Sequence, residues 1–188
     1  MIQVALEFTG ESKRHLAQLE RETPKTFRAA LNAASNHARN RLRKILREGG
    51  GHYGVPRFAA HHPMTTLLHP GCRMFGLLAN KYNIVRYRKG DGQVIGWVDG
   101  GNGTGNLSGW ASSMQGAARY EFIEWQKSAL HRNNPALKGY KIPSYYDRPS
   151  RPVIDPFAAH LQRSFPSMVL GEFNKAVARR LKKGKAVT

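Results

Sequence analysis

One long amphipathic helix limits the folds open to this chain. Thr23 followed by Pro24 is a favourable pair for starting a helix, and Gly49-Gly50-Gly51 is a strong stop. Between these signals the apolar residues recur at steps of three and four, which places them in one narrow stripe. The stripe consists of Phe27, Leu31, Ala34, Ala38, Leu42 and Ile45. A helix of about 25 residues is about 37 Å long, enough to cross a small sheet completely.

Alternating and turn-forming residues predict the strands. Residues 2 to 9 alternate between apolar and more polar side chains, so we expect a half-buried strand that ends at Gly10. A short helix should follow over residues 11 to 21. Residues 84–88 and 94–98 flank Lys89-Gly90-Asp91-Gly92, which predicts a hairpin with a turn of about four or five residues. The apolar residues from Met114 to Trp125 favour a helix, followed by an irregular stretch to about residue 150.

The chain closes with a proline-bracketed segment and a basic helix. Pro152 and Pro156 disfavour helical backbone in the residues before them, so residues 151–155 are expected to be a short extended strand. A helix should begin at Pro156, and Pro166 should kink or restart it.

Together the elements predict an α+β fold in which the long helix packs across a small antiparallel sheet. We expect one domain over residues 1–182, with loop excursions at 49–80 and 99–109, and a basic flexible tail at 183–188.

The charge is unusual for a soluble enzyme of this size. The 188 residues include 30 Lys and Arg against 12 Asp and Glu, a formal charge of +18. Such an excess is usually screened by phosphate or by an acidic partner surface. The hydrophobic content of 40% still predicts a folded core. A single cysteine excludes an intrachain disulfide framework, and we expect neither a secretion signal nor a membrane span.

Two basic helix faces are the candidate interaction surfaces. Arg39, Arg43 and Arg47 form an i, i+4, i+8 row, in which like charges repel unless a counter-charge lies close. The final helix carries a second basic face, made of Lys175, Arg179 and Lys182. These faces can meet DNA without reading its sequence, or they can meet an acidic protein neighbour. Tyrosines among basic residues at 138–151 can stack on single strands or be buried beneath the loop.

Residue types suited to catalysis or metal binding form no ordered motif. The histidines of the 49–80 loop and Cys72 match zinc-site spacing only at His69-x-x-Cys72. The glycines at 100–105 lack the endings of phosphate-binding motifs. Glu121 and Glu124 lack the partners that a metal-dependent nuclease needs. We therefore expect no enzyme activity, no metal and no cofactor, and a nuclease that depends on His69 or Glu121 remains the third hypothesis.

Two segments carry a resemblance to a known group of proteins. They are Pro24 to Arg47, with its run Phe27-Arg28-Ala29-Ala30-Leu31-Asn32-Ala33-Ala34, and Arg151 to Leu181, which opens Arg-Pro-Val-Ile-Asp-Pro-Phe. The chain resembles the tail-completion and head-tail joining proteins of tailed bacteriophages, including the minor tail protein Z group of lambda-like phages.

The resemblance implies a noncatalytic part of the virion neck, assembled in the host cytoplasm. It implies a closed ring, commonly of about six subunits. It also implies contacts with the head-tail connector and with tail terminator or tail tube proteins, and proximity to genomic DNA. The alternative is a nonspecific DNA- or RNA-binding protein that acts through its basic helix faces.

Overall fold

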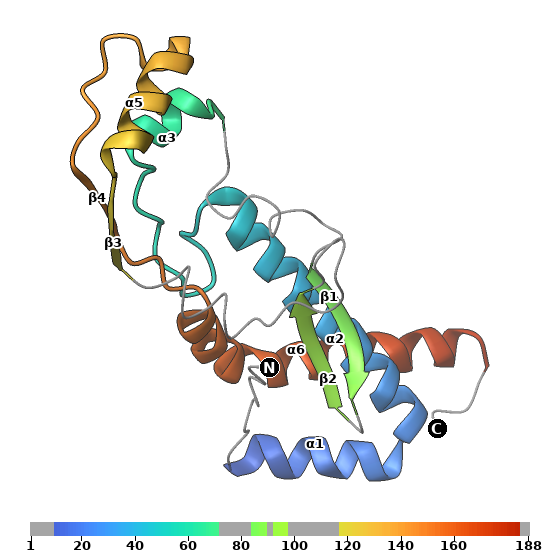
Figure 1. Cartoon of the computed structure of the whole chain (residues 1–188). Coiled ribbons are helices and arrows are strands. Elements are labelled where there is room, and N and C mark those ends of the chain that lie inside the picture. The colour runs from blue at the N-terminus through green and yellow to red at the C-terminus, as the bar shows by residue number, and fades with distance from the viewer. Residues whose placement is uncertain (1–9, 72–83, 90–91, 98–116, 185–188) are drawn as a thin grey trace.

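The computed structural model describes residues 10–71, 84–89, 92–97 and 117–184. Its fold is α+β, as the sequence predicts, with five α-helices and two small antiparallel sheets in the described part. In chain order the elements are α1 (Gly10–Glu22), α2 (Pro24–Glu48), α3 (Pro63–Leu68), β1 (Ile84–Lys89), β2 (Gly92–Trp97), β3 (Ala118–Glu121), α5 (Glu124–Asn133), the 3-10 helix η2 (Pro135–Leu137), β4 (Tyr145–Arg148) and α6 (Ile154–Lys182). Figure 1 shows α1, α2, α6 and the β1–β2 hairpin at one end and α3, α5 and β3–β4 at the other.

The long helix and its stop signal are confirmed. Helix α2 runs from Pro24 to Glu48, and Gly49 follows in the left-handed conformation at φ 78° with its amide donating to the carbonyl of Ile45. Thr23 precedes the helix as predicted, but its hydroxyl does not cap it. The Thr23 Oγ1 donates instead to the carbonyl of Leu19 at 2.9 Å, because Thr23 joins α2 directly to the end of α1.

The core lies where α2 and α6 cross. Ala30, Ala34 and Ala38 are at most 1% exposed, and their small side chains let the two helices approach closely. The helices run in opposite directions, since His37 meets Glu172 while Arg41 meets Ser164, which comes earlier in α6. The other core members are Leu16, Phe27, Leu42, Ile45, Leu46, Val55, Phe58, Val153, Phe157, Leu161, Phe165, Val169 and Phe173.

The predicted hairpin is present, with a shorter connection than expected. Strands β1 and β2 pair antiparallel from Ile84–Trp97 to Lys89–Gly92, so only residues 90 and 91 separate them. Pairing therefore continues into the segment that was predicted to be the turn. The hairpin lies against α2, so a small antiparallel sheet does pack on the long helix. The predicted strand over residues 2–9 and the loop at 99–109 lie outside the described residues.

The prediction of a helix from Met114 to Trp125 is wrong. Residues Ala118–Glu121 form β3, which pairs with β4 in the stretch predicted to be irregular, and α5 begins only at Glu124. The pairing joins residues far apart in the chain, including Tyr120 with Tyr146. Periodicity within one segment cannot detect such a partner. The 49–80 excursion also contains a helix, α3, within its described part.

The C-terminal segment forms a helix earlier than predicted. No strand spans residues 151–155, because α6 begins at Ile154 and the Phe157 amide closes its first turn by donating to the Val153 carbonyl at 3.1 Å. Pro156 lies in that first turn, where an amide needs no partner within the helix. Helix α6 then continues through Pro166 without a restart, and the Pro166 ring is buried. None of the described helices is long and apolar enough to cross a membrane.

Candidate functional site

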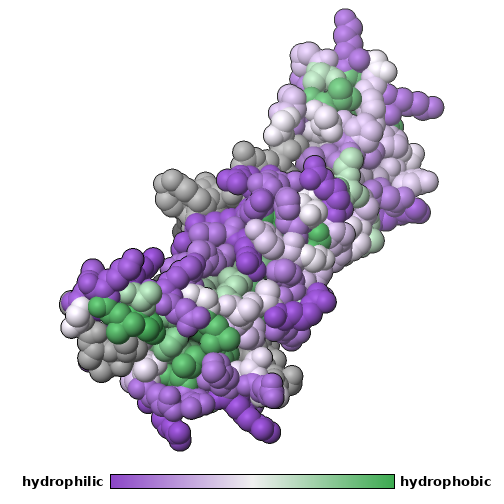
Figure 2. Space-filling model, turned by 180° about the vertical axis from the view of Figure 1, so that it is seen from behind, coloured by the Kyte–Doolittle hydropathy of each residue, from purple (hydrophilic) through white to green (hydrophobic). Residues whose placement is uncertain are grey.

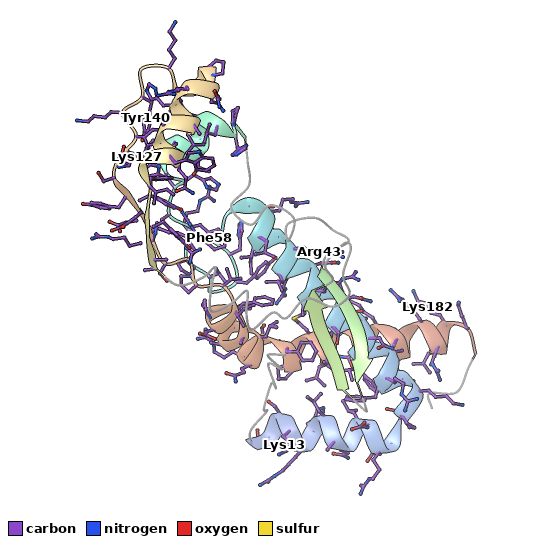
Figure 3. All side chains as sticks on the ribbon, viewed as in Figure 1. Lys13, Arg43, Phe58, Lys127, Tyr140 and Lys182 are labelled. Carbon is purple, nitrogen blue, oxygen red and sulfur yellow. The ribbon has the colours of Figure 1, made fainter. Side chains whose placement is uncertain are left out.

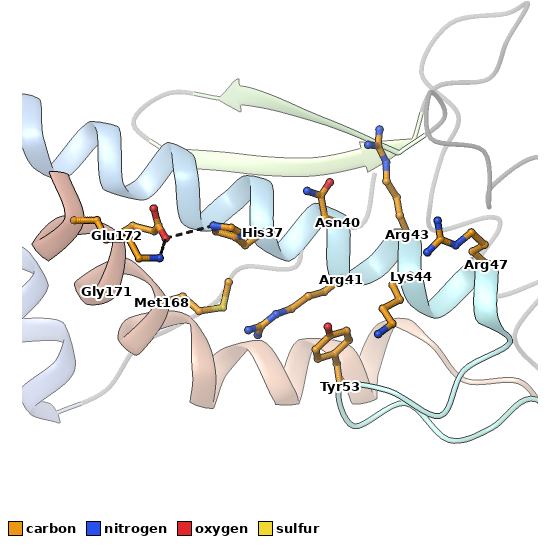
Figure 4. A pocket seen from close by; sticks show the side chains of 11 residues that line it. His37, Asn40, Arg41, Arg43, Lys44, Arg47, Tyr53, Met168, Gly171 and Glu172 are labelled. Atoms are coloured by element: carbon orange, nitrogen blue, oxygen red, sulfur yellow. Dashed lines mark hydrogen bonds and ion pairs between the residues drawn. The ribbon is translucent and has the colours of Figure 1, made fainter. Parts of the chain in front are cut away.

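A basic groove of about 690 Å³ runs along α2 beside α6 (Figure 4). Its lining includes five cationic side chains and one carboxylate. The cations are Arg41, Arg43, Lys44, Arg47 and Lys175, and the carboxylate is Glu172. His37, Asn40, Tyr53, Met168 and Gly171 complete the lining. The dominant property of this site is positive charge.

Helical geometry explains why these residues lie together. At about 100° per residue, His37, Asn40 and Lys44 fall on the side of α2 opposite the buried Leu42 and Ile45. Arg41 lies at the edge of this basic side that faces α6. In Figure 4 Arg43 points instead towards the β1–β2 hairpin. The exposed side of α2 thus presents a continuous basic arc, wider than a single row at four-residue spacing.

The structure brings only part of the predicted basic faces together. Arg43, Arg47 and Lys175 line the groove, whereas Arg39, Arg179 and Lys182 do not. Arg39 is half-buried and donates from Nη2 to the amide oxygen of Asn40 at 3.4 Å. Arg179 and Lys182 are exposed in the last turn of α6, where Figure 3 shows Lys182 at the far end of the helix. The two predicted rows are therefore not a single surface.

The arginines on α2 are crowded. Partial burial lowers the pKa of Arg43 below its usual value, and repulsion from the Arg39 guanidinium lowers it further. The Nε atom of Arg39 is buried without a hydrogen-bond partner. Such crowding is unfavourable in the isolated chain, so an anion close to this arc would relieve it.

Among the described residues, Glu172 is the one carboxylate that lines the groove, and it is already engaged. Lys175 Nζ donates to its Oε1 at 2.7 Å, and His37 Nε2 lies 3.4 Å from the same oxygen. These partners lower the pKa of Glu172, with the Lys175 hydrogen bond as the largest cause. Glu172 therefore stays ionised and cancels part of the positive charge at this end of the groove.

A tight loop holds the other end of the groove. Tyr53 has φ 51°, the only non-glycine residue with positive φ in the described chain, and its ring lies under the Arg41 guanidinium at 4.9 Å. Arg41 Nη1 also lies 3.4 Å from His160 Nε2 and 3.4 Å from Ser164 Oγ. Burial lowers the pKa of His160, and the Arg41 and Arg163 charges lower it further. A neutral His160 can accept from the Arg41 guanidinium at this contact, which helps to hold Arg41 in place.

Sequence reasoning missed Arg41, Lys44, His37 and Tyr53. The first three carried a usable signal, because they lie three or four residues apart on the exposed side of a helix that was already predicted. Tyr53 carried none. Its place depends on the close approach of the 49–58 loop to α6, where a Cβ on Gly54 would lie 3.1 Å from the Pro156 carbonyl oxygen.

A second surface lies on β3 and β4, at the other end of the molecule. The Tyr120 and Tyr146 rings stack at 5.6 Å, and the Arg148 guanidinium lies 5.5 Å from the Tyr120 ring. Arg119 lies 4.4 Å from the Tyr145 ring and pairs with both carboxylate oxygens of Asp147. Tyr145 is 50% exposed, so it is not buried beneath a loop. Tyr120 is 43% exposed, although its ring lies beside both Tyr146 and Arg148.

The histidines of the 49–71 segment have separate local roles. His52 Nε2 pairs with Glu48 at 2.8 Å, and His62 Nδ1 accepts from the Met64 amide at the start of α3. His69 ends α3. Within the described residues, no three His, Cys, Asp or Glu side chains form a group that could hold a metal ion. Cys72 and the glycines at 100–105 lie outside those residues.

Glu121 and Glu124 also lie on different elements. Glu121 ends β3 and pairs across the sheet with Tyr145, whereas Glu124 begins α5 and accepts from Lys127 Nζ at 2.6 Å. The chemistry that the groove offers is electrostatic, with cationic donors along two helices.

Comparison of the chain with protein-family models, with curated proteins and with solved structures finds no significant match.

Proposed function

We propose that this protein is a noncatalytic structural component of a tailed-phage virion, which completes the tail and joins it to the head as a closed ring of about six copies. The element order supports the proposal. A long helix carries a hairpin on its side, and the segment Arg-Pro-Val-Ile-Asp-Pro-Phe leads into a basic helix that packs across it. The ring would contact the head-tail connector on one side and tail terminator or tail tube proteins on the other.

The observation that carries the proposal is the exposure of large apolar side chains at two separate ends. Trp125 is 74% exposed and Ile123 59% at the end formed by α5, while Leu181 is 64% exposed near the end of α6. Figure 2 shows hydrophobic surface at both ends, with polar surface between them. Exposed apolar surface of this kind commonly marks a protein contact. Two different surfaces are what a head-to-tail ring requires.

Paired variants of the purified protein test the ring. Trp125→Ser and Leu181→Ser should each lower the mass of the assembly in sedimentation velocity, because each removes one side of every subunit contact. A mixture of the two variants keeps one intact contact, between the Trp125 end of one and the Leu181 end of the other. Dimers are therefore expected in the mixture. If only monomers form, Trp125 and Leu181 do not meet across a subunit contact.

The virion role is tested in a phage whose copy of this gene is interrupted. Electron microscopy of the lysate should show filled heads separate from free tails, or tails of aberrant length. Normal joined particles would reject the role.

A nonspecific DNA- or RNA-binding protein is the second candidate function, and the basic groove favours it. The formal charge of +18 supports binding without sequence preference. This function predicts tight binding by the isolated monomer with a steep salt dependence. Normal particles in the microscopy experiment together with such binding would make it the leading function.

A further inference from the structure

We infer that the groove along α2 and α6 binds the phosphodiester backbone of DNA. The inference names a ligand surface that the ring proposal does not require. The DNA-binding assay and the microscopy of the virion can therefore fail independently of one another.

The groove concentrates charge from two helices on one ligand path. Arg41, Lys44 and Arg47 line it from α2 and Lys175 lines it from α6, while Arg43 lines the side that faces the β1–β2 hairpin. Glu172 opposes them but is already shared between Lys175 and His37. Glu48 lies beside the groove and contacts Arg47 at 3.2 Å and Lys44 at 3.9 Å. The cations therefore outnumber the carboxylates within reach.

The spacing of the cations suits a chain of phosphates. The cations that α2 contributes, from Arg41 to Arg47, span a rise of about 9 Å along the helix axis. The phosphates of one B-DNA strand are spaced about 3.4 Å apart along the duplex axis, so this length corresponds to the axial rise of about three phosphates. That number is comparable with the cations on the groove.

The lining fits a polyphosphate better than an acidic protein segment. Protein partners are usually anchored by apolar or aromatic side chains in well-packed pockets. Within the part of the chain that the structure describes, the apolar lining is limited to Met168 and the ring of Tyr53, and the ring already lies under Arg41. Arg41 is held in place by Tyr53, His160 and Ser164 before any ligand arrives. The prepositioned Arg41 and the lack of a large apolar anchor favour the DNA backbone.

The test removes one cation from each helix of the groove. Lys44→Gln combined with Lys175→Gln should weaken binding of a labelled 20-base-pair duplex about tenfold, measured by fluorescence anisotropy. It should also reduce the slope of log K against log salt by about 2. Arg179→Gln combined with Lys182→Gln removes two charges from the same protein outside the groove. This matched control should leave affinity and slope near wild type.

Glu172→Gln should change the DNA affinity of the same groove in the opposite direction. Loss of its charge frees Lys175 and His37, so the duplex should bind several-fold tighter. Glu124→Gln is the matched control, since Glu124 also pairs with a lysine three residues later, at 2.6 Å, but lies on α5. Circular dichroism melts would confirm that all variants fold. The inference is overturned if wild type binds no DNA, if both double variants lose affinity equally, or if Glu172→Gln does not tighten binding.

Discussion

The two ends of this molecule are stabilised in different ways. We use "body" for α1, α2, the 49–58 loop and α6, and "outer region" for α3 and residues 117–150. Among the side chains that the structure describes, every member of the main hydrophobic core belongs to the body or is Val153, directly before α6. In the outer region, among the described residues, only Met64 and Leu137 are buried hydrophobics, while Trp125, Ile123, Tyr145, Tyr120 and Leu67 are exposed. The body can fold by burying its own apolar surface, and the outer region leaves much of its apolar surface to a partner.

The contacts that hold the outer region are mostly polar and exposed. Arg119 and Asp147 form a two-pronged pair, but their side chains are 62% and 57% exposed. Lys127 pairs with Glu124, whose side chain is 88% exposed. Exposed ion pairs of this kind contribute little to stability, because water screens both charges. The comparison therefore predicts that substitutions in the body cost far more stability than matched substitutions in the outer region.

The largest effect is expected from Phe157→Ala. Phe157 is 4% exposed between α6 and α2, so the truncation should lower the free energy of unfolding by about 3–5 kcal/mol. Trp125→Ala removes a larger side chain that is 74% exposed, and should cost below about 0.5 kcal/mol at concentrations where the protein is monomeric. Urea unfolding of both variants measures the difference. Equal losses would show that the outer region is packed as firmly as the body.

Two neighbouring glycines give the next largest contrast. Gly50 has φ 79°, and a Cβ there would lie 2.1 Å from the Pro56 carbonyl oxygen. Gly50→Ala should therefore cost about 2–4 kcal/mol, from left-handed strain together with overpacking. Gly49→Ala has almost the same φ of 78° but meets nothing within 4 Å. It should cost only about 1 kcal/mol in the same urea titration. Similar costs would mean that the loop moves away from Pro56 easily.

Arg151 links the body to the loop that leads into the outer region. It is 6% exposed and donates from Nε to the Ala59 carbonyl at 3.2 Å and from Nη2 to the Ala60 carbonyl at 3.0 Å. Arg151→Met keeps the apolar stem and leaves both carbonyls unpaired, at a cost of about 2 kcal/mol. Limited proteolysis should then cut near residues 59–60 before the body unfolds.

Arg163→Met serves as the control, because Arg163 is exposed and donates to the Ala159 carbonyl of its own helix. It should leave the proteolysis pattern unchanged. If Arg151→Met instead unfolds the whole chain in one step without early cuts, the outer region and the body are one cooperative unit.

Local sequence signals were sufficient to predict much of the secondary structure of the body. The stripe from Phe27 to Ile45, the proline start and the glycine stop predict α2 because a helix depends on neighbours three and four residues apart. The β1–β2 hairpin beside the body could also be predicted locally, because its two strands are joined by a short turn segment. The general preference against helix before proline gave the wrong start for α6, since the first turn tolerates Pro156.

The outer region and the groove depend on residues distant in the chain. Strand β3 forms because it pairs with β4, with Tyr120 opposite Tyr146. Neither segment alone has a pattern of alternating residues long enough to predict a strand. The basic residues of α2 were identified as candidates from spacing. Their division between the groove and its surroundings depends on where α6 crosses α2, and a single helical wheel does not contain that information.

The smallest predicted effect is the pH dependence that His160 gives to the stability of the body. Burial and the charges of Arg41 and Arg163 lower the pKa of His160 below its ordinary value of about 6.5. The unfolded chain therefore binds the proton more tightly than the folded chain. At pH 7.5 His160 is neutral in both the folded and the unfolded chain, so it does not lower the free energy of unfolding. As pH falls below about 6.5, the unfolded chain binds the proton first, and the free energy of unfolding decreases until the pH passes the lowered pKa of the folded state.

Exchange of the histidine isolates this contribution. His160→Gln retains an acceptor for Arg41, so it should lose less free energy of unfolding between pH 7.5 and 5.5 than wild type. Urea titrations at the two pH values give the comparison. His131→Gln alters an exposed histidine of the outer region and should keep the wild-type pH dependence. If the two variants behave alike, the contact of His160 with Arg41 does not distinguish the body from the outer region, and the prepositioning of Arg41 would have to come from Tyr53 and Ser164 alone.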